Sequence, residues 1–168
     1  MIRKLLSITF LIALPVASAF AQQKPNLTGT WKLNVAKSDF GALPAPESRT
    51  DVITHKDPAI SNSVTMTNAQ GKQEYTLNYT TDGKEALNKI GEREIRSTLK
   101  WAGSDLASTA KTTYNGMDVS GEGTWVLAAD GKTLTISVHY VSAMGETDQK
   151  LVFEKQESAP AAVPAKTP

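Results

Sequence analysis

The residues most often used for acid–base and metal chemistry are sparse in this sequence. It contains two histidines, His55 and His139, and no cysteine. The alternation around His139 places it on the polar side of its segment, and we interpret both imidazoles as surface groups. Without cysteines a structural zinc site is not expected. The carboxylates are scattered, and none has the spacing of an acid–base pair on one inward face.

Sequence motifs of nucleophilic and nucleotide chemistry are missing as well. There is no Gly-x-Ser-x-Gly elbow and no glycine-rich phosphate loop. The sequence therefore predicts a protein that is not an enzyme and uses no cofactor.

The first 21 residues have the pattern of a cleavable signal peptide. Two basic residues precede an apolar run over 5–16, which is too short to span a bilayer comfortably. Small residues in Ala19-Phe20-Ala21 favour cleavage before Gln22, and Ala17-Ser18-Ala19 is the alternative site. No cysteine follows for lipid attachment. We expect a secreted or periplasmic protein with no stable membrane anchor after cleavage.

The rest of the chain is close to neutral and divides into three parts. The sequence has 18 basic and 17 acidic residues, and removal of the two basic leader residues leaves 16 against 17. Such a balance gives no electrostatic footprint for nucleic acid and no polybasic patch for lipid. We expect a short linker over 22–26, one domain over 27–156, and a disordered Ala- and Pro-rich tail over 157–168.

Glycine turns divide the central region into short alternating segments. Asp82-Gly83, Asn115-Gly116 and Asp130-Gly131 favour two-residue hairpins, because both residues of each pair accept positive φ. No window has a sustained helical period. We predict an all-β fold, an antiparallel up-and-down β-barrel of about ten strands, which in sequential order can close on themselves. The predicted strands are 29–35, 49–56, 60–68, 72–80, 84–90, 92–101, 104–114, 117–128, 132–142 and 146–155.

Alternation assigns an inward side to most of these strands, because side chains alternate across a strand. The inward residues predicted for three of them are Trp31, Leu33 and Val35; Tyr75, Leu77 and Tyr79; and Ile95, Leu99 and Trp101. The strand 49–56 is ambiguous, since Val52 and Ile53 compete for the inward side. The connection over 36–48 contains Pro44 and Pro46 and is predicted to be a loop.

The first and last strands resemble those of the calycins, the group that includes lipocalins and fatty-acid-binding proteins. Gly29-Thr30-Trp31 matches the Gly-x-Trp opening of lipocalins, and the extension to Leu33 resembles the opening of fatty-acid-binding proteins. The segment 151–155 is similar to the last strand of that family. Lys37 to Gly41 and Trp125 to Thr135 also resemble small secreted bacterial proteins, a resemblance that implies no activity.

The carboxylate clamp of fatty-acid-binding proteins does not carry over. That family holds the ligand carboxylate with an Arg-x-Tyr pair in its last strand, where this chain has Leu151 and Phe153. The family's helical lid is replaced here by the loop over 36–48. Unless Arg93 or Arg96 turns inward, the interior carries no cation, and a buried unpaired carboxylate is costly. Any interior ligand is therefore expected to be neutral and apolar, with fatty acids binding poorly.

Two non-enzymatic functions fit these features. The first is a lipocalin-like barrel that binds a small apolar or hydrophobic molecule. Its cavity would be lined by Trp31, Tyr75, Tyr79, Trp101, Trp125 and Phe153. Trp31 also fits a purely structural role that packs the barrel base. The alternative is a protein-interaction or inhibitor module with a filled core, which would dock through the loop Phe40 to Glu47.

Overall fold

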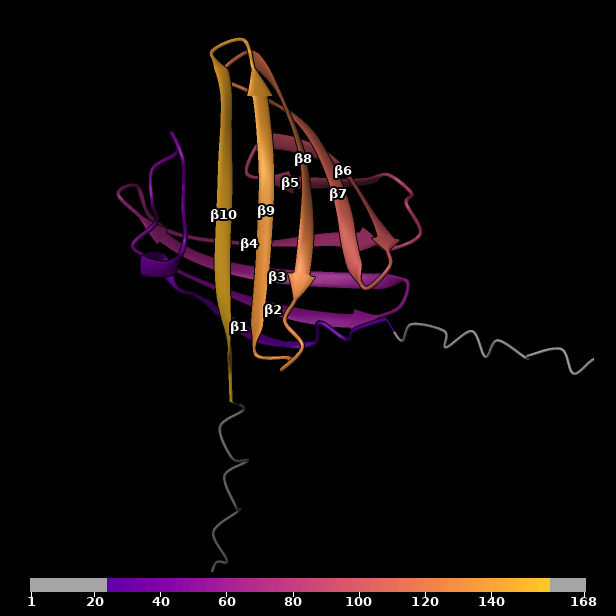
Figure 1. Ribbon diagram of the computed structural model, residues 1–168. Helices are drawn as coiled ribbons and strands as arrows, with labels where there is room; N and C mark the ends of the chain where they lie inside the picture. The colour runs from indigo at the N-terminus through magenta and orange to yellow at the C-terminus, as the bar shows by residue number, and fades with distance from the viewer. Residues whose placement is uncertain (1–23, 158–168) are drawn as a thin grey trace, which may run out of the picture.

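The chain folds into a single ten-stranded antiparallel sheet that curls into a calycin-like barrel (Figure 1). The computed structural model describes residues 24–157, so the expected signal peptide and all but the first residue of the expected tail lie outside it. The order in the sheet is β4-β3-β2-β1-β10-β9-β8-β7-β6-β5. The strands are β1 (Gly29–Leu33), β2 (Ser48–Lys56), β3 (Ala59–Asn68), β4 (Gly71–Thr80), β5 (Ala86–Ile90), β6 (Arg93–Ala102), β7 (Asp105–Tyr114), β8 (Met117–Leu127), β9 (Thr133–Ser142) and β10 (Gly145–Gln156).

The strands and most of their faces agree with the pattern of the sequence. Every predicted strand is present, and each end lies within two residues of the expected position. The turn at Asn115 and Gly116 has φ of 50° and 77°, the backbone that this dipeptide favours in a two-residue hairpin. One inward assignment is wrong. Because β1 ends at Leu33, Val35 lies in a short 3-10 turn, η1 (Val35–Lys37), and is exposed.

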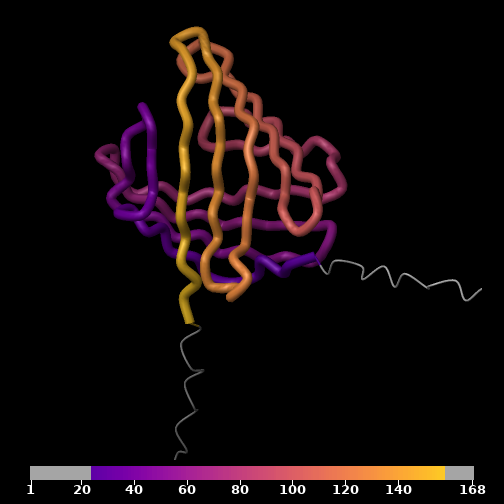
Figure 2. The backbone as a smooth tube through the Cα atoms, in the orientation of Figure 1, coloured from indigo at the N-terminus to yellow at the C-terminus, as the bar shows by residue number. Residues whose placement is uncertain are grey.

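The barrel is flattened into two curved layers. In Figures 1 and 2 the strands β8, β9 and β10 stand upright, and β2, β3 and β4 cross them at a steep angle. The first strand lies between β2 and β10, and so joins the two layers. Within residues 24–157 the fold contains no helix that is long and apolar enough to cross a membrane.

The barrel is not closed by backbone hydrogen bonds all the way round. The strands β4 and β5 stand at the two ends of the sheet order and form no ladder with each other. A side chain bridges them instead. Asn88 of β5 accepts from the Asn78 amide at 2.7 Å and donates to the Asn78 carbonyl oxygen at 2.9 Å. The barrel is therefore nearly closed, with one seam between β4 and β5, where Asp82-Gly83 lies in a connection and not in the expected hairpin.

One end of the barrel is filled. Trp31 has no exposed surface, and its indole Nε1 donates to the Leu27 carbonyl oxygen at 2.9 Å. Leu27 itself is buried beneath the barrel. The side chains packed around them come from seven strands and are Leu33, Ile53, Ile60, Leu99, Leu106, Leu134 and Phe153. Leu27 and this layer form the closed base.

Candidate functional site in the barrel interior

Above the base, the inward side chains become less buried. Inward side chains farther along the strands are only partly buried, although their strands run on from the base without a break. These partly exposed inward residues include Tyr75, Tyr79, Ile95, Ala110, Thr112, Val119, Val138 and Tyr140. An interior that admits solvent at one end and is sealed at the other has the form of a ligand-binding cup.

Small residues make one wall of this cup. Ala110 of β7 lies beside Gly121 of β8, and Ser108 lies beside Gly123. A Cβ added at Gly121 would stand 3.0 Å from the Tyr140 ring. The Tyr140 ring therefore occupies the space that a side chain at Gly121 would take, and Val138 packs against both glycines.

A buried ion pair is the main polar feature of the interior. Arg49 and Asp51 occupy alternate positions on the inward face of β2. The guanidinium donates to both carboxylate oxygens, from Nε to Oδ1 at 2.7 Å and from Nη2 to Oδ2 at 2.8 Å. Asn62 of β3 donates from Nδ2 to Asp51 Oδ2 at 2.7 Å. The Asp51 side chain is 2 % exposed and that of Arg49 is 17 % exposed, so the cation lies nearer to the open interior.

This pair corrects the expectation that the interior carries no cation. Burial acts to lower the pKa of Arg49, but the charge and hydrogen bonds of Asp51 outweigh it and the pKa is raised, so the guanidinium stays charged. The guanidinium carbon lies 5.3 Å from the centre of the Phe153 ring. The cation thus comes from β2, while β10 presents the apolar Phe153 as the sequence indicated.

Two inward tyrosines, Tyr79 and Tyr140, are affected by the charge of Arg49. Burial raises the pKa of both Tyr79 and Tyr140, and both pKa values respond to the charge of Arg49. The Tyr79 ring meets Trp125 edge to face, with ring centres 5.7 Å apart. Phenolic hydroxyls beside a charged group give this part of the interior hydrogen-bonding capacity within an otherwise apolar lining.

The six residues expected to line a cavity lie at different levels. Tyr75 and Tyr79 face the open interior and are partly exposed. Trp125 is 8 % exposed and lies just below them, against Tyr79. Trp31 and Phe153 belong to the closed base. Trp101 packs against the base, and its indole donates to Asp57.

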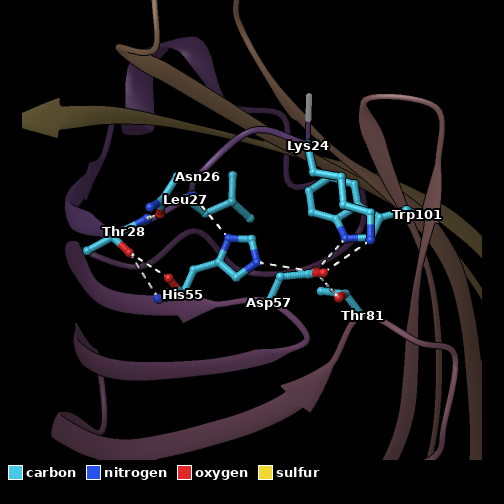
Figure 3. Close-up of polar contacts among 8 residues, drawn as sticks. All are labelled: Lys24, Asn26, Leu27, Thr28, His55, Asp57, Thr81 and Trp101. Carbon is cyan, nitrogen blue, oxygen red and sulfur yellow. Dashed lines mark hydrogen bonds and ion pairs between the residues drawn. The ribbon is translucent and has the colours of Figure 1, made fainter. Parts of the chain in front are cut away.

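A polar cluster seals the base from outside (Figure 3). His55 Nδ1 accepts from the Leu27 amide at 3.3 Å, and its ring stacks on Trp101 with centres 6.0 Å apart. Asp57 accepts from Thr81, from the Trp101 indole at 2.8 Å and from Lys24 at 3.1 Å. These donors, Thr81 first, hold the pKa of Asp57 well below its usual range. Residues from Lys24 onward therefore pack against the barrel.

The two histidines differ in their surroundings. The surface interpretation is wrong for His55, whose side chain is 4 % exposed. It is correct for His139, which lies on the outer face of β9 and contacts Asp148 at 2.8 Å. His139 is part of a shallow groove of about 350 Å³ on the outer wall. In the part of the chain that the structure describes, no group of histidines and carboxylates is arranged to hold a metal ion.

The loop Phe40 to Glu47, expected as a docking segment, is attached to the barrel. Phe40 packs against the core, and the Ala42 amide donates to Thr147 Oγ1 at 2.9 Å. The Glu47 amide donates to the Thr67 carbonyl oxygen at 2.9 Å. Most of the loop is nevertheless exposed, and Leu43 is its exposed large apolar residue.

Solved structures with the same architecture confirm the fold. Zebrafish ileal bile acid-binding protein in complex with cholic acid is similar over 77 % of this chain and 98 % of its own, with 12 % identity and a TM-score of 0.53. A secretory abundant heat soluble protein from Ramazzottius varieornatus is similar over 81 % of this chain and 99 % of its own, with 11 % identity and a TM-score of 0.54. No protein-family model matches the sequence, and no curated protein matches it. At such identities the likeness establishes the calycin-like barrel and leaves function to the site.

Proposed function

We propose that this protein is a secreted calycin-like carrier that binds one small, mainly apolar molecule inside its barrel and carries out no reaction on it. The observation that carries the proposal is the partial exposure of inward side chains above a sealed base. A molecule entering the cup would replace solvent on Tyr75, Tyr79 and Val138, and burial of such apolar surface favours binding.

Further support comes from polar atoms without partners inside the barrel. Ser97 Oγ and Asn62 Oδ1 are buried and have no hydrogen-bond partner among residues 24–157. Buried polar groups normally find partners in protein, water or ligand. The likeness to a bile acid-binding protein adds a precedent for small-molecule binding in this fold. Export rests on the signal-like leader, and absence of catalysis rests on Asp51 being fully engaged by Arg49 and Asn62.

A filling substitution tests the proposal. Ala110 and Ala107 lie on the same strand, the first inward and partly buried, the second outward and exposed. Ala110→Phe should fill the cup and weaken binding of the neutral probe Nile red at least tenfold. Ala107→Phe places the same ring on the outer wall and should leave binding unchanged. Binding is followed by probe fluorescence, and the fold of each variant by circular dichroism.

Stability of the same variants separates a hollow interior from a filled one. Overpacking a filled core costs about 1–3 kcal/mol, whereas a phenyl ring added to an open cup should cost less than about 1 kcal/mol. Urea unfolding of Ala110→Phe measures this. A large loss together with no Nile red binding by the unaltered protein would contradict the carrier function and favour an interaction module that docks through Phe40 to Glu47.

A further inference from the structure

The buried ion pair has a consequence for the charge of the ligand. Its two charges lie on one strand, two residues apart, and cancel each other inside the barrel. Asp51 is held on three sides, by two hydrogen bonds from Arg49 and one from Asn62. Because Asp51 is almost fully buried, any group that displaced it from Arg49 would leave a carboxylate without a counter-charge and without water.

Arg49 has donors to spare. Its Nε and Nη2 bind Asp51, and no hydrogen bond from Nη1 is found within residues 24–157. The Arg49 side chain is 17 % exposed and that of Asp51 is 2 % exposed, so the cation is the more accessible member of the pair. A ligand therefore meets the positive end of a neutral pair. An oxygen acceptor on an uncharged ligand, such as a hydroxyl or carbonyl, can accept from this edge without breaking the pair.

The other charges on the inner surface are peripheral. Arg93 begins β6 at the edge of the cup and lies over the exposed Tyr114 ring, 5.6 Å from its centre. His55 and Asp57 lie at the opposite end, outside the hydrophobic base. Arg96, the other cation that could have faced inward, pairs with Glu85 on the surface. The charge of Arg93 also acts on Tyr140 from the edge of the cup, and the Arg49–Asp51 pair sets the charge deeper in the described interior.

We propose that Asp51 acts as a specificity residue, which restricts the cup to uncharged ligands that carry an oxygen acceptor and excludes carboxylates. This inference rests on the proposed carrier function. The sequence predicted that carboxylates are disfavoured because the interior has no cation. Here they are disfavoured because the charge of the interior cation, Arg49, is already neutralised by Asp51. The inference also assigns the polar end of the ligand to Arg49.

Three ligands of equal chain length test the selection: decan-1-ol, methyl decanoate and decanoic acid. Binding at pH 7.5 is followed by intrinsic tryptophan fluorescence, since Trp125 lies against Tyr79 in the cup. The unaltered protein should bind the alcohol and the ester at least tenfold more tightly than the acid. Asp51→Asn keeps the shape, frees the charge of Arg49, and should reverse the order, so that the acid binds tenfold more tightly than the alcohol.

Two further variants complete the experiment. Asp148→Asn makes the same charge change on an exposed outer residue and should leave the order of the three ligands unchanged. The double variant Arg49→Met, Asp51→Leu removes both charges without leaving one unpaired, and should weaken the alcohol and the ester about tenfold while undecane binds as before. It provides the test of the Arg49 donor if Asp51→Asn does not fold.

The possible outcomes distinguish failure of the inference about Asp51 from failure of the proposed carrier function. Binding of the acid by the unaltered protein as tightly as the alcohol overturns the inference and leaves the carrier function standing. An unchanged ligand order in Asp51→Asn, or unchanged alcohol binding in the double variant, also overturns the inference and leaves the carrier function standing. Failure of all three ligands and Nile red to bind overturns the carrier function, and the selection with it.

Discussion

The single residue Trp31 contacts the hydrophobic core, the N-terminal segment and β10. Its ring is fully buried among the core side chains, its indole N–H is bonded to Leu27, and Lys155 of β10 lies 5.3 Å from the ring centre. The Leu27 amide in turn donates to His55. The base of the barrel thus depends on a short chain of contacts that links the N-terminal segment, β1 and β2.

Replacing Trp31 should therefore be among the most destabilising single changes. Trp31→Ala creates a large cavity and removes the hydrogen bond to Leu27, and should lower the free energy of unfolding by about 3–5 kcal/mol. Tyr114→Ala removes an aromatic ring that is 54 % exposed and should change it by less than about 0.5 kcal/mol. Urea denaturation measures both. A loss below 1 kcal/mol for Trp31→Ala would mean that the base is not packed as described.

The two histidines should give stability opposite dependences on pH. Burial lowers the pKa of His55, although Asp57 partly opposes this, so the unfolded chain takes up the proton first and stability falls as the pH drops below about 6.5. The hydrogen bond to Asp148 raises the pKa of His139. Its contribution is present below about pH 6.5 and is lost as the pH rises through the raised pKa.

Urea midpoints at pH 5.5, 6.5 and 7.5 test this pair of effects. His55→Gln should reduce the fall in stability toward low pH, because the group that takes up the proton on unfolding is gone. His139→Gln should steepen that fall, because a contribution that grows at low pH is gone. If His55→Gln and the unaltered protein lose stability in parallel between pH 7.5 and 5.5, His55 is not buried in its neutral form.

The sequence did not predict which side chains of β2 point inward. Val52 and Ile53 are both β-branched and apolar, so the pattern alone left two faces for β2. Ile53 is buried and Val52 is exposed, which turns Arg49, Asp51 and His55 inward. An Arg and an Asp two residues apart on a strand share a face, and that spacing was the one signal that a buried pair could exist.

At the scale of elements, β4 and β5 are joined by one side chain. The bridge from Asn88 to Asn78 satisfies a backbone amide and a backbone carbonyl that no neighbouring strand reaches. Asn88 is 5 % exposed, so water does not replace these bonds readily. Because this side-chain bridge stands in place of a backbone ladder, we expect the barrel wall to open most easily at the seam between the two strands.

Removing the bridge tests this description. Asn88→Ala leaves the Asn78 amide and carbonyl without partners and should cost about 1–3 kcal/mol. The Asn78 amide should also exchange its hydrogen faster, a local effect seen by NMR. Asn68→Ala is the control, since the Asn68 side chain accepts only from the Gln70 amide in an exposed turn. Unchanged exchange at Asn78 in Asn88→Ala would show that the seam is held by other contacts.

The strands and turns were predicted more completely than the seam between β4 and β5. Glycines and Asn-Gly or Asp-Gly pairs mark the turns, and period-two alternation marks the strands, so both signals are local. Closure is not local. Whether β4 and β5 share a ladder depends on curvature summed over ten strands, and neither strand carries a residue pattern that reports it.

For the whole molecule, sequence-distant pairing should set the folding rate. Neighbouring strands pair in order from β1 to β4 and from β5 to β10, but the ladder from Thr30 to Gln156 joins the first strand to the last. All-β folds with such pairings refold in milliseconds to seconds. Stopped-flow tryptophan fluorescence after dilution from urea should show refolding in that range. Relaxation within 100 microseconds would contradict it.

The position of β1 between β2 and β10 also has a consequence for synthesis. A ribosome that adds about 5–20 residues per second needs several seconds or more to pass from β1 to β10. During that time β10, the strand that pairs with β1 and carries Phe153, is missing, so Trp31 and Leu33 lack these neighbours. The growing chain cannot seal its base until its final strand emerges. A polypeptide that stays unfolded until translation ends can be threaded through a narrow translocation pore, as the export that we propose would require.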